Sequence, residues 1–117
     1  MADKTLEMTL LFDFFGDLLT EKQREYFDLY YNNDLSLSEI AELNGISRQG
    51  VRDLLIRAEN QLREYEEKTG VVARFSQMQK SLDHLKIKAD KLMELTADND
   101  IRSLAEELSQ GLDRLKG

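Results

Sequence analysis

Two serine-capped segments joined by a glycine turn constrain the fold of this chain more than any other feature. Ser36 precedes Glu39 by three residues, the spacing at which a hydroxyl and a carboxylate cap a helix start together. Asn44 and Gly45 then interrupt the helical pattern, and glycine favours the positive φ that ends many helices. Ser47 is a good cap for the next segment. The stretch therefore predicts a short helix, a tight turn and a second, longer helix.

This arrangement is typical of a helix-turn-helix, in which a supporting helix holds a second helix whose first turns enter the major groove of DNA. We expect Ile40 and Leu43 to form the buried face of the supporting helix, and Ile46 to fill the core beneath the turn. Val51 and Leu55 are expected to anchor the second helix. That orientation turns another face of the second helix outward, carrying Arg48, Gln49, Arg52, Asp53, Ile56 and, further along, Arg57.

The rest of the chain is also predicted to be helical, because apolar residues recur three and four positions apart and there are 0 prolines. The first helix is expected to be a core helix; its wide apolar face carries Leu6, Leu10, Leu11, Phe14, Phe15, Leu18 and Leu19. The fold class is therefore all-α. The helices are expected over about residues 4–19, 21–31, 36–43, 47–69, 71–95 and 99–115. Thr20 is a good cap for the second of these helices, and Gly70 is expected to end the fourth.

The last two helices carry apolar residues at heptad spacing, and the short link between them favours an antiparallel hairpin. We expect a helix-turn-helix domain over residues 1–69 and a helical hairpin over residues 70–117. One hairpin cannot shield both apolar stripes, so it folds back on the first helices or pairs with another copy; we predict a homodimer. The expected seams are Val71, Phe75, Met78, Leu82, Leu85, Ala89 and Leu92, and Ile101, Ala105, Leu108, Leu112 and Leu115.

The charge of the chain argues against simple phosphate-driven binding. The net charge is −7, whereas domains that bind nucleic acid are usually basic. From Thr20 to Arg63 there are six basic and eight acidic residues. Only the stretch from Ser47 to Arg63 is positive, with four arginines against Asp53 and Glu59. Any contact with nucleic acid is therefore expected on the second helix of the motif.

The chemistry of those outward side chains suits such a contact. Arginine pairs with guanine and glutamine with adenine in the major groove, and a hydroxyl at a helix start binds phosphate. The predicted nucleic-acid-binding residues are Ser47, Arg48, Gln49, Arg52 and Arg57. The opposing interpretation, a plain solvated face, remains open for all of them.

Other functions find little support in the sequence. There are 0 cysteines and one histidine, His84, and neither phosphate-binding glycine motif occurs. We therefore expect no enzyme, no metal site and no cofactor. No apolar run approaches the length of about 20 residues that spans a membrane, and the acidic start is unlike a secretory signal. A cytoplasmic protein without membrane insertion is expected.

Two resemblances extend this picture. The stretch from Leu19 to Glu64 resembles region 4 of bacterial sigma factors, in the pattern S-x-x-E-I-A, G-I-S and V-x-x-x-L-x-R-A. The first 68 residues or so resemble the YlxM family (UPF0122) of small bacterial helix-turn-helix proteins. The segments "LYYNNDLSLSEIAE" and "SRQGV" carry that second resemblance. Its genes typically neighbour that of the signal recognition particle GTPase, which implies a regulatory or accessory role in protein targeting.

Two hypotheses for the function follow. In the first, the chain is a regulatory protein that binds DNA or signal recognition particle RNA through its arginines and takes part in that pathway. In the second, it is a protein-interaction adaptor whose acidic surface binds the signal recognition particle GTPase without contacting nucleic acid.

Overall fold

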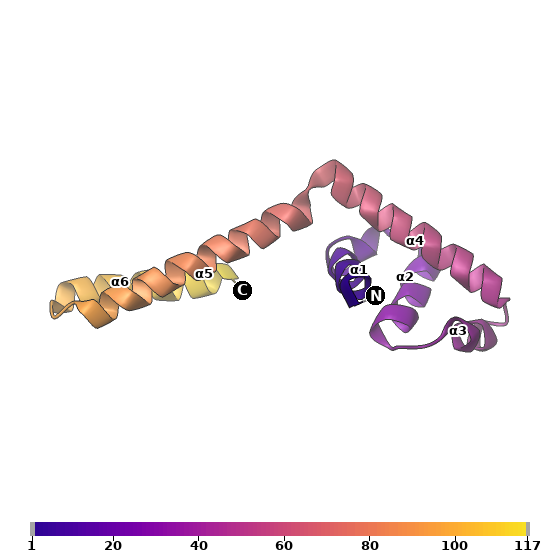
Figure 1. Cartoon of the computed structure of the whole chain (residues 1–117), viewed down its shortest axis with the longest axis horizontal. Coiled ribbons are helices and arrows are strands. Elements are labelled where there is room, and N and C mark those ends of the chain that lie inside the picture. Colours follow the sequence, from indigo (N-terminus) through magenta and orange to yellow (C-terminus); the bar gives the residue numbers. More distant parts are fainter. Residues whose placement is uncertain (1, 117) are drawn as a thin grey trace. The chain divides into compact units, whose positions relative to one another are not determined.

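The described residues form helices joined by short links, with no β-strand among them. This computed structural model describes the backbone of residues 2–116 and the side chains of residues 4–116. Contacts divide the chain into two compact units, Met1–Val72 and Ala73–Gly117. The helices, drawn in Figure 1, are α1 (Ala2–Phe15), η1 (Gly16–Leu18), α2 (Glu21–Phe27), η2 (Asp28–Asn32), α3 (Leu37–Asn44), α4 (Arg48–Thr69), α5 (Val71–Leu95) and α6 (Asn99–Lys116).

Side-chain caps set where the helices begin. Thr20 accepts the backbone N–H of Gln23, whose side-chain oxygen accepts the N–H of Thr20 in return. Ser36 and Glu39 form the same reciprocal pair at the start of α3, which confirms the predicted capping box. The hydrogen bonds from Ser36 lower the pKa of the Glu39 carboxyl, because they stabilise its charged form. Each pair satisfies two backbone groups that no helical bond reaches.

Glycines end the two helices that flank the turn region, as the sequence predicts. Gly45 follows α3 with φ 65° and ψ 32°, and its N–H reaches the carbonyl of Ala41. Gly70 follows α4 in the same left-handed conformation, with φ 62°. Ser47 accepts the N–H of Gly50 at 3.0 Å and so begins α4. The helix-turn-helix is therefore present from α3 through the start of α4.

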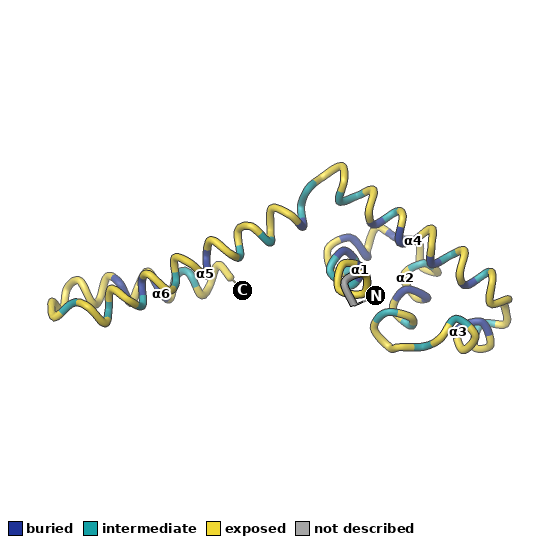
Figure 2. The backbone as a smooth tube through the Cα atoms, in the orientation of Figure 1, coloured by how far each residue is buried: buried dark blue, intermediate teal, exposed yellow. Residues whose placement is uncertain are grey.

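The core of the Met1–Val72 unit forms where α4 packs against α1, α2 and α3 (Figure 2). The predicted stripe of α4 is buried, including Val51, Leu55 and Leu62. Phe27 is fully buried and stacks on Phe12 with ring centroids 4.6 Å apart. The buried apolar residues of this core are Met8, Leu11, Phe15, Leu19, Tyr26, Phe27, Ile40, Ala41, Val51, Leu55, Ala58, Leu62 and Val72.

Some apolar residues predicted to be buried are exposed instead. Leu43 is 69% exposed and Ile46 is 41% exposed, so both predictions for the turn were wrong. With only eight residues, α3 turns Ile40 and Ala41 toward the core and leaves Leu43 on the outside. Of the apolar face predicted for the first helix, Leu6, Phe14 and Leu18 are exposed, because this segment turns its Met8 side toward the core. Leu11, Phe15 and Leu19 are buried as predicted.

Two helix ends differ from regular α-helix. The predicted first helix finishes as a short 3₁₀ turn, η1. The predicted second helix finishes as a π-helical turn, η2, in which the N–H of Asn33 bonds to the carbonyl of Asp28. Asp34 then takes a positive φ of 58°, a conformation that aspartate tolerates better than most residues. This widened turn places Tyr31 next to α4.

The Ala73–Gly117 unit is the expected antiparallel hairpin of α5 and α6, but its contact line differs from the predicted seam. Leu82 and Ala89 of α5 are buried, together with Ala105 and Ser109 of α6. Lys86 lies between the first two on the same line and is half-buried. Most of the other predicted seam residues of this unit are exposed, namely Phe75, Met78, Leu85, Leu92, Ile101, Leu108 and Leu115. Leu112 is half-buried.

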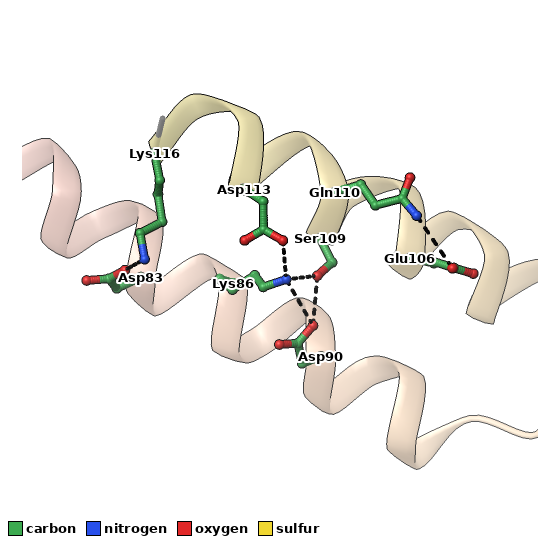
Figure 3. Close-up of polar contacts among 8 residues, drawn as sticks. All are labelled: Asp83, Lys86, Asp90, Glu106, Ser109, Gln110, Asp113 and Lys116. Atoms are coloured by element: carbon green, nitrogen blue, oxygen red, sulfur yellow. Dashed lines mark hydrogen bonds and ion pairs between the residues drawn. The ribbon is translucent and has the colours of Figure 1, made fainter.

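A polar cluster occupies the middle of the hairpin (Figure 3). The ammonium of Lys86 donates to Ser109 Oγ at 2.6 Å and to Asp113 Oδ2 at 2.8 Å. Ser109 in turn donates to Asp90 Oδ1 at 2.8 Å. The hydrogen bond to Asp113 raises the pKa of Lys86, because it favours the charged ammonium. The cluster therefore fixes the register of the two helices.

Candidate nucleic-acid interface

The helix-turn-helix presents the first three turns of α4 at its outer surface. Ser47 lies at the start of α4 and is exposed, and its hydroxyl keeps its own hydrogen while its oxygen accepts the Gly50 N–H. A Cβ at Gly50 would lie 3.1 Å from Ser47 Oγ, so a side chain here would crowd the cap. The glycine that weakens the helix on propensity grounds thus leaves room for its capping residue.

The predicted site residues of α4 fall into two lines along the helix. Arg48 and Arg52 are four residues apart and therefore share one side. Gln49, Asp53 and Arg57 are also spaced by four and form a neighbouring line. All five are exposed. The amide of Gln49 donates to Asp53 Oδ1 at 2.9 Å, so Gln49 has to leave this bond before it can bind both edge atoms of an adenine.

The arginines of α4 differ in whether their charge is already neutralised. Arg63 lies 3.3 Å from Glu7, and in the α1–α2 region Arg24 lies 3.7 Å from Asp17. Among residues 4–116, by contrast, no carboxylate forms an ion pair with Arg48, Arg52 or Arg57. The unneutralised positive charge of α4 is therefore concentrated on the first half of the helix, as the sequence predicts for an acidic chain.

A shallow groove of about 170 Å³ runs beside Arg52. Its walls include Tyr30, which is 36% exposed, and Lys4 from the first turns of α1. Leu37 of α3 and Ile56 of α4 supply apolar wall. Neither Lys4 nor the groove was predicted, because no spacing pattern links the start of the chain to α4.

The groove is also lined by a charged group that the sequence did not mark as functional, Glu59. Glu59 is only 7% exposed, on the buried side of α4. The hydroxyl of Tyr31 donates to its carboxylate, and the ammonium of Lys4 lies 3.2 Å away. Burial, the hydrogen bond to Glu59 and the negative charge of Glu59 all raise the pKa of Tyr31 above its ordinary value of 10.0. Glu59 follows Leu55 by four residues, so the buried stripe of α4 does pass through this position.

The described residues carry neither a metal-binding cluster nor a membrane-spanning helix. Residues 4–116 contain no cluster of three or more acidic, histidine or cysteine side chains able to hold a metal ion. No helix within the described part of the chain combines the length and the apolarity needed to cross a membrane.

The capped turn and the exposed arginines of α4 define a helix-turn-helix protein. The model of the family described as "Putative helix-turn-helix protein, YlxM / p13 like" matches residues 2–103. The chain therefore belongs to the UPF0122 family, as its resemblance to YlxM proteins implies.

Relatives match over most of their length. A UPF0122 protein of Thermoanaerobacter sp. (strain X514) is 48% identical over 115 residues, covering 98% of each chain. One of Halalkalibacterium halodurans is 53% identical over 91 residues, covering 78% of this chain and 84% of the relative. One of Listeria innocua is 42% identical over 108 residues, covering 92% of this chain and 96% of the relative. The similarity thus extends well past the helix-turn-helix.

Proposed function

We propose that this protein is a nucleic-acid-binding regulator that contacts DNA or signal recognition particle RNA through the first half of α4. The observation that carries the proposal is the group of exposed arginines without an ion-pair partner among residues 4–116, Arg48, Arg52 and Arg57. In a chain of net charge −7, exposed cations without an ion-pair partner attract phosphate locally.

The side chains have distinct roles in this proposal. Arg48 and Arg52, on one side of α4, bind phosphates or the O6 and N7 atoms of guanine. Ser47 donates its hydroxyl hydrogen to a phosphate at the start of α4. Gln49 exchanges its bond with Asp53 for a base edge. The resemblance to the YlxM family supplies the pathway, protein targeting by the signal recognition particle.

Salt titration of binding tests the proposal. Fluorescence anisotropy with duplex DNA and with signal recognition particle RNA should show affinity that falls steeply as salt rises. Replacing Arg48 and Arg52 together by alanine should reduce the slope of log K against log salt on duplex DNA by about 1.8, since each lost phosphate contact removes about 0.9. Arg63→Ala is the matched control, because Glu7 already neutralises that arginine. Tight binding by the double variant, or no binding by the parent at low salt, would falsify the proposal.

A second candidate function, the adaptor, is favoured by the surface of α1. Leu6 and Phe14 of α1 are exposed there, as is Leu18 of the adjoining η1. Asp13 and Asp17 are exposed on the same helical segment. An apolar strip bordered by carboxylates suits a partner that presents both apolar and basic side chains. The signal recognition particle GTPase is the partner that the family resemblance suggests.

One pair of variants separates the two functions. Leu6→Asp should abolish binding of the purified GTPase in calorimetry if the adaptor function is correct, while leaving nucleic-acid binding intact. The Arg48/Arg52 double variant should have the opposite effect if α4 is the functional surface. A GTPase that does not bind the parent chain rules out the adaptor.

A further inference from the structure

The hairpin has two unlike broad faces. The contact line between α5 and α6 separates these two faces. On one side lie Asp90 of α5 and Asp113 of α6, which both belong to the Lys86 cluster (Figure 3). Because these two aspartates meet at one ammonium, they mark the same face of the hairpin.

The opposite face is apolar on both helices. Asp90 follows Ala89 of the contact line by one position, which places it on one side of the line. Leu85 precedes Lys86 by one position, and Leu92 precedes the half-buried Met93, which lies four residues beyond Ala89. Leu85 and Leu92 therefore flank the line on the side away from Asp90. Leu104 and Leu108 of α6 flank it on the side away from Asp113 for the same reason, preceding Ala105 and Ser109. The exposed apolar residues of this face are Met78, Leu85, Leu92, Ile101, Leu104, Leu108 and Leu115.

A hollow runs along the α6 half of this apolar face. It has a volume of about 640 Å³ and is lined by Leu104, Leu108, Leu112 and Leu115, with Glu107 and Arg114 at its border and Gly111 in its floor. Gly111 has no Cβ, so the backbone is accessible there and a large side chain from a second helix has room to enter. The hollow has the size and chemistry of a packing site for the side chains of another helix.

The hairpin alone buries very little. Within its described residues, 73–116, the buried apolar side chains are only Leu82, Ala89 and Ala105. Two amphipathic helices normally form one layer of a two-layer structure, and a second layer covers their shared apolar face. The apolar face therefore needs an apolar partner of similar length.

Charges at the two edges of the apolar face indicate which partner fits. The outer edge of α5 carries Lys88 and Lys91, whereas the outer edge of α6 carries Glu107 and, two turns further along, Arg114. The cluster pairs Lys86 with Ser109 and Asp113, and Lys116 pairs with Asp83. This antiparallel register puts Glu107 at the level of residues 88–91 of α5.

A second copy of the chain satisfies these charges. Two copies can be related by a two-fold axis that runs parallel to the helices, between their apolar faces. This rotation leaves the height of each residue along the axis unchanged, and it places α5 of one copy over α6 of the other. Glu107 of each copy then lies opposite Lys88 and Lys91 of the second copy, twice in the dimer. The apolar faces close into a bundle of four helices in which all neighbours are antiparallel.

We propose that the α5–α6 hairpin dimerises through its leucine face, Met78, Leu85, Leu92, Ile101, Leu104, Leu108 and Leu115, with α5 of one copy packed on α6 of the other. This interaction is independent of the proposed nucleic-acid contact, because it involves only the Ala73–Gly117 unit. The Lys86 cluster lies on the opposite face of the hairpin, so it stays accessible to solvent in the dimer.

Sedimentation of the full chain tests the proposal. The parent should sediment at twice the 13.6 kDa mass of the chain, whereas Leu108→Glu should sediment as a monomer with unchanged helical circular dichroism. Ile87→Glu is the matched control. Ile87 is as exposed as the leucines, at 66%, but it lies two positions from Leu85 and so on another side of α5. A monomeric parent, a dimeric Leu108→Glu, or dissociation by Ile87→Glu refutes the proposal.

A charge exchange tests the orientation of the two copies without touching the apolar face. Glu107→Lys and Lys88→Glu should each weaken the dimer by roughly tenfold at low salt, because two ion pairs become repulsive in each dimer. The double variant Lys88→Glu/Glu107→Lys should recover most of that loss. If the double variant loses as much dimer affinity as the two single variants together, α5 does not lie over α6 of the second copy.

Discussion

The contact between Tyr31 and Glu59 makes a quantitative prediction about pH. Tyr31 comes from the π-helical turn η2 and is half-buried, and its hydroxyl donates to a carboxylate that is nearly inaccessible to solvent. A hydrogen bond to a charged group contributes about 1.5–3 kcal/mol. We therefore expect Tyr31→Phe to lower the free energy of unfolding by about 2 kcal/mol near neutral pH.

This stabilisation should disappear in alkaline solution. The pKa of Tyr31 is raised in the folded state, first by burial and then by Glu59, so its contribution is complete below the ordinary value of 10.0 and is lost above it. Above that pH the unfolded chain releases a proton that the folded chain keeps, which removes about 1.4 kcal/mol of stability per pH unit. The parent and Tyr31→Phe should therefore become equally stable near pH ~11.5.

Urea denaturation followed by circular dichroism measures both curves. The difference between the parent and Tyr31→Phe isolates this hydroxyl from the other tyrosines and the lysines, which titrate in both proteins. In a Glu59→Gln background the effect of Tyr31→Phe should shrink below about 1 kcal/mol, because the charged acceptor is gone. A difference that stays constant from pH ~8 to ~11.5 would show that the Tyr31 proton is not held by Glu59.

Two further predictions concern the folding of the Met1–Val72 unit. Leu62→Ala should cost about 2–5 kcal/mol, because the leucine is fully buried between α4 and its neighbours; a loss below about 1 kcal/mol would mean that the core closes over the gap. Gly45→Ala should cost about 1–2 kcal/mol through backbone strain alone, since φ is 65° and no atom lies within 4 Å of the added Cβ. Gly45→Asn, which tolerates this conformation, should cost less, and equal losses for both variants would contradict the strain argument. Chemical denaturation measures all three.

Local signals in the sequence predicted the helix boundaries well. Thr20, Ser36 and Ser47 cap helices where expected, and Gly45 and Gly70 end them. These signals work at short range, because a cap acts on amides three residues away and a positive φ belongs to one residue. The π-helical turn at η2 has no comparable signal, since it depends on how the aromatic side chains pack against α4.

Burial was predicted less well where a helix has apolar residues on more than one side. On α5 the heptad pattern marks both Leu82 and Leu85, and only the pairing with α6 decides that Leu82 is buried and Leu85 exposed. Leu43 shows the same difficulty on a shorter helix. For the candidate site, the exposure of Arg48 and Arg52 followed from the spacing of Val51 and Leu55. The groove with Lys4 depends on a distant segment and lay beyond any local pattern.

The Lys86 cluster also bears on which foreign helices this hairpin tolerates. A cell contains many amphipathic helices whose leucine stripes would satisfy an apolar groove of any origin. Few of them would offer a hydroxyl and a carboxylate at the spacing of Ser109 and Asp113, and without these groups the Lys86 ammonium loses two hydrogen bonds across the hairpin. The Lys86 cluster therefore favours pairing of α5 with α6 over pairing with another amphipathic helix, although an all-leucine contact would be more stable.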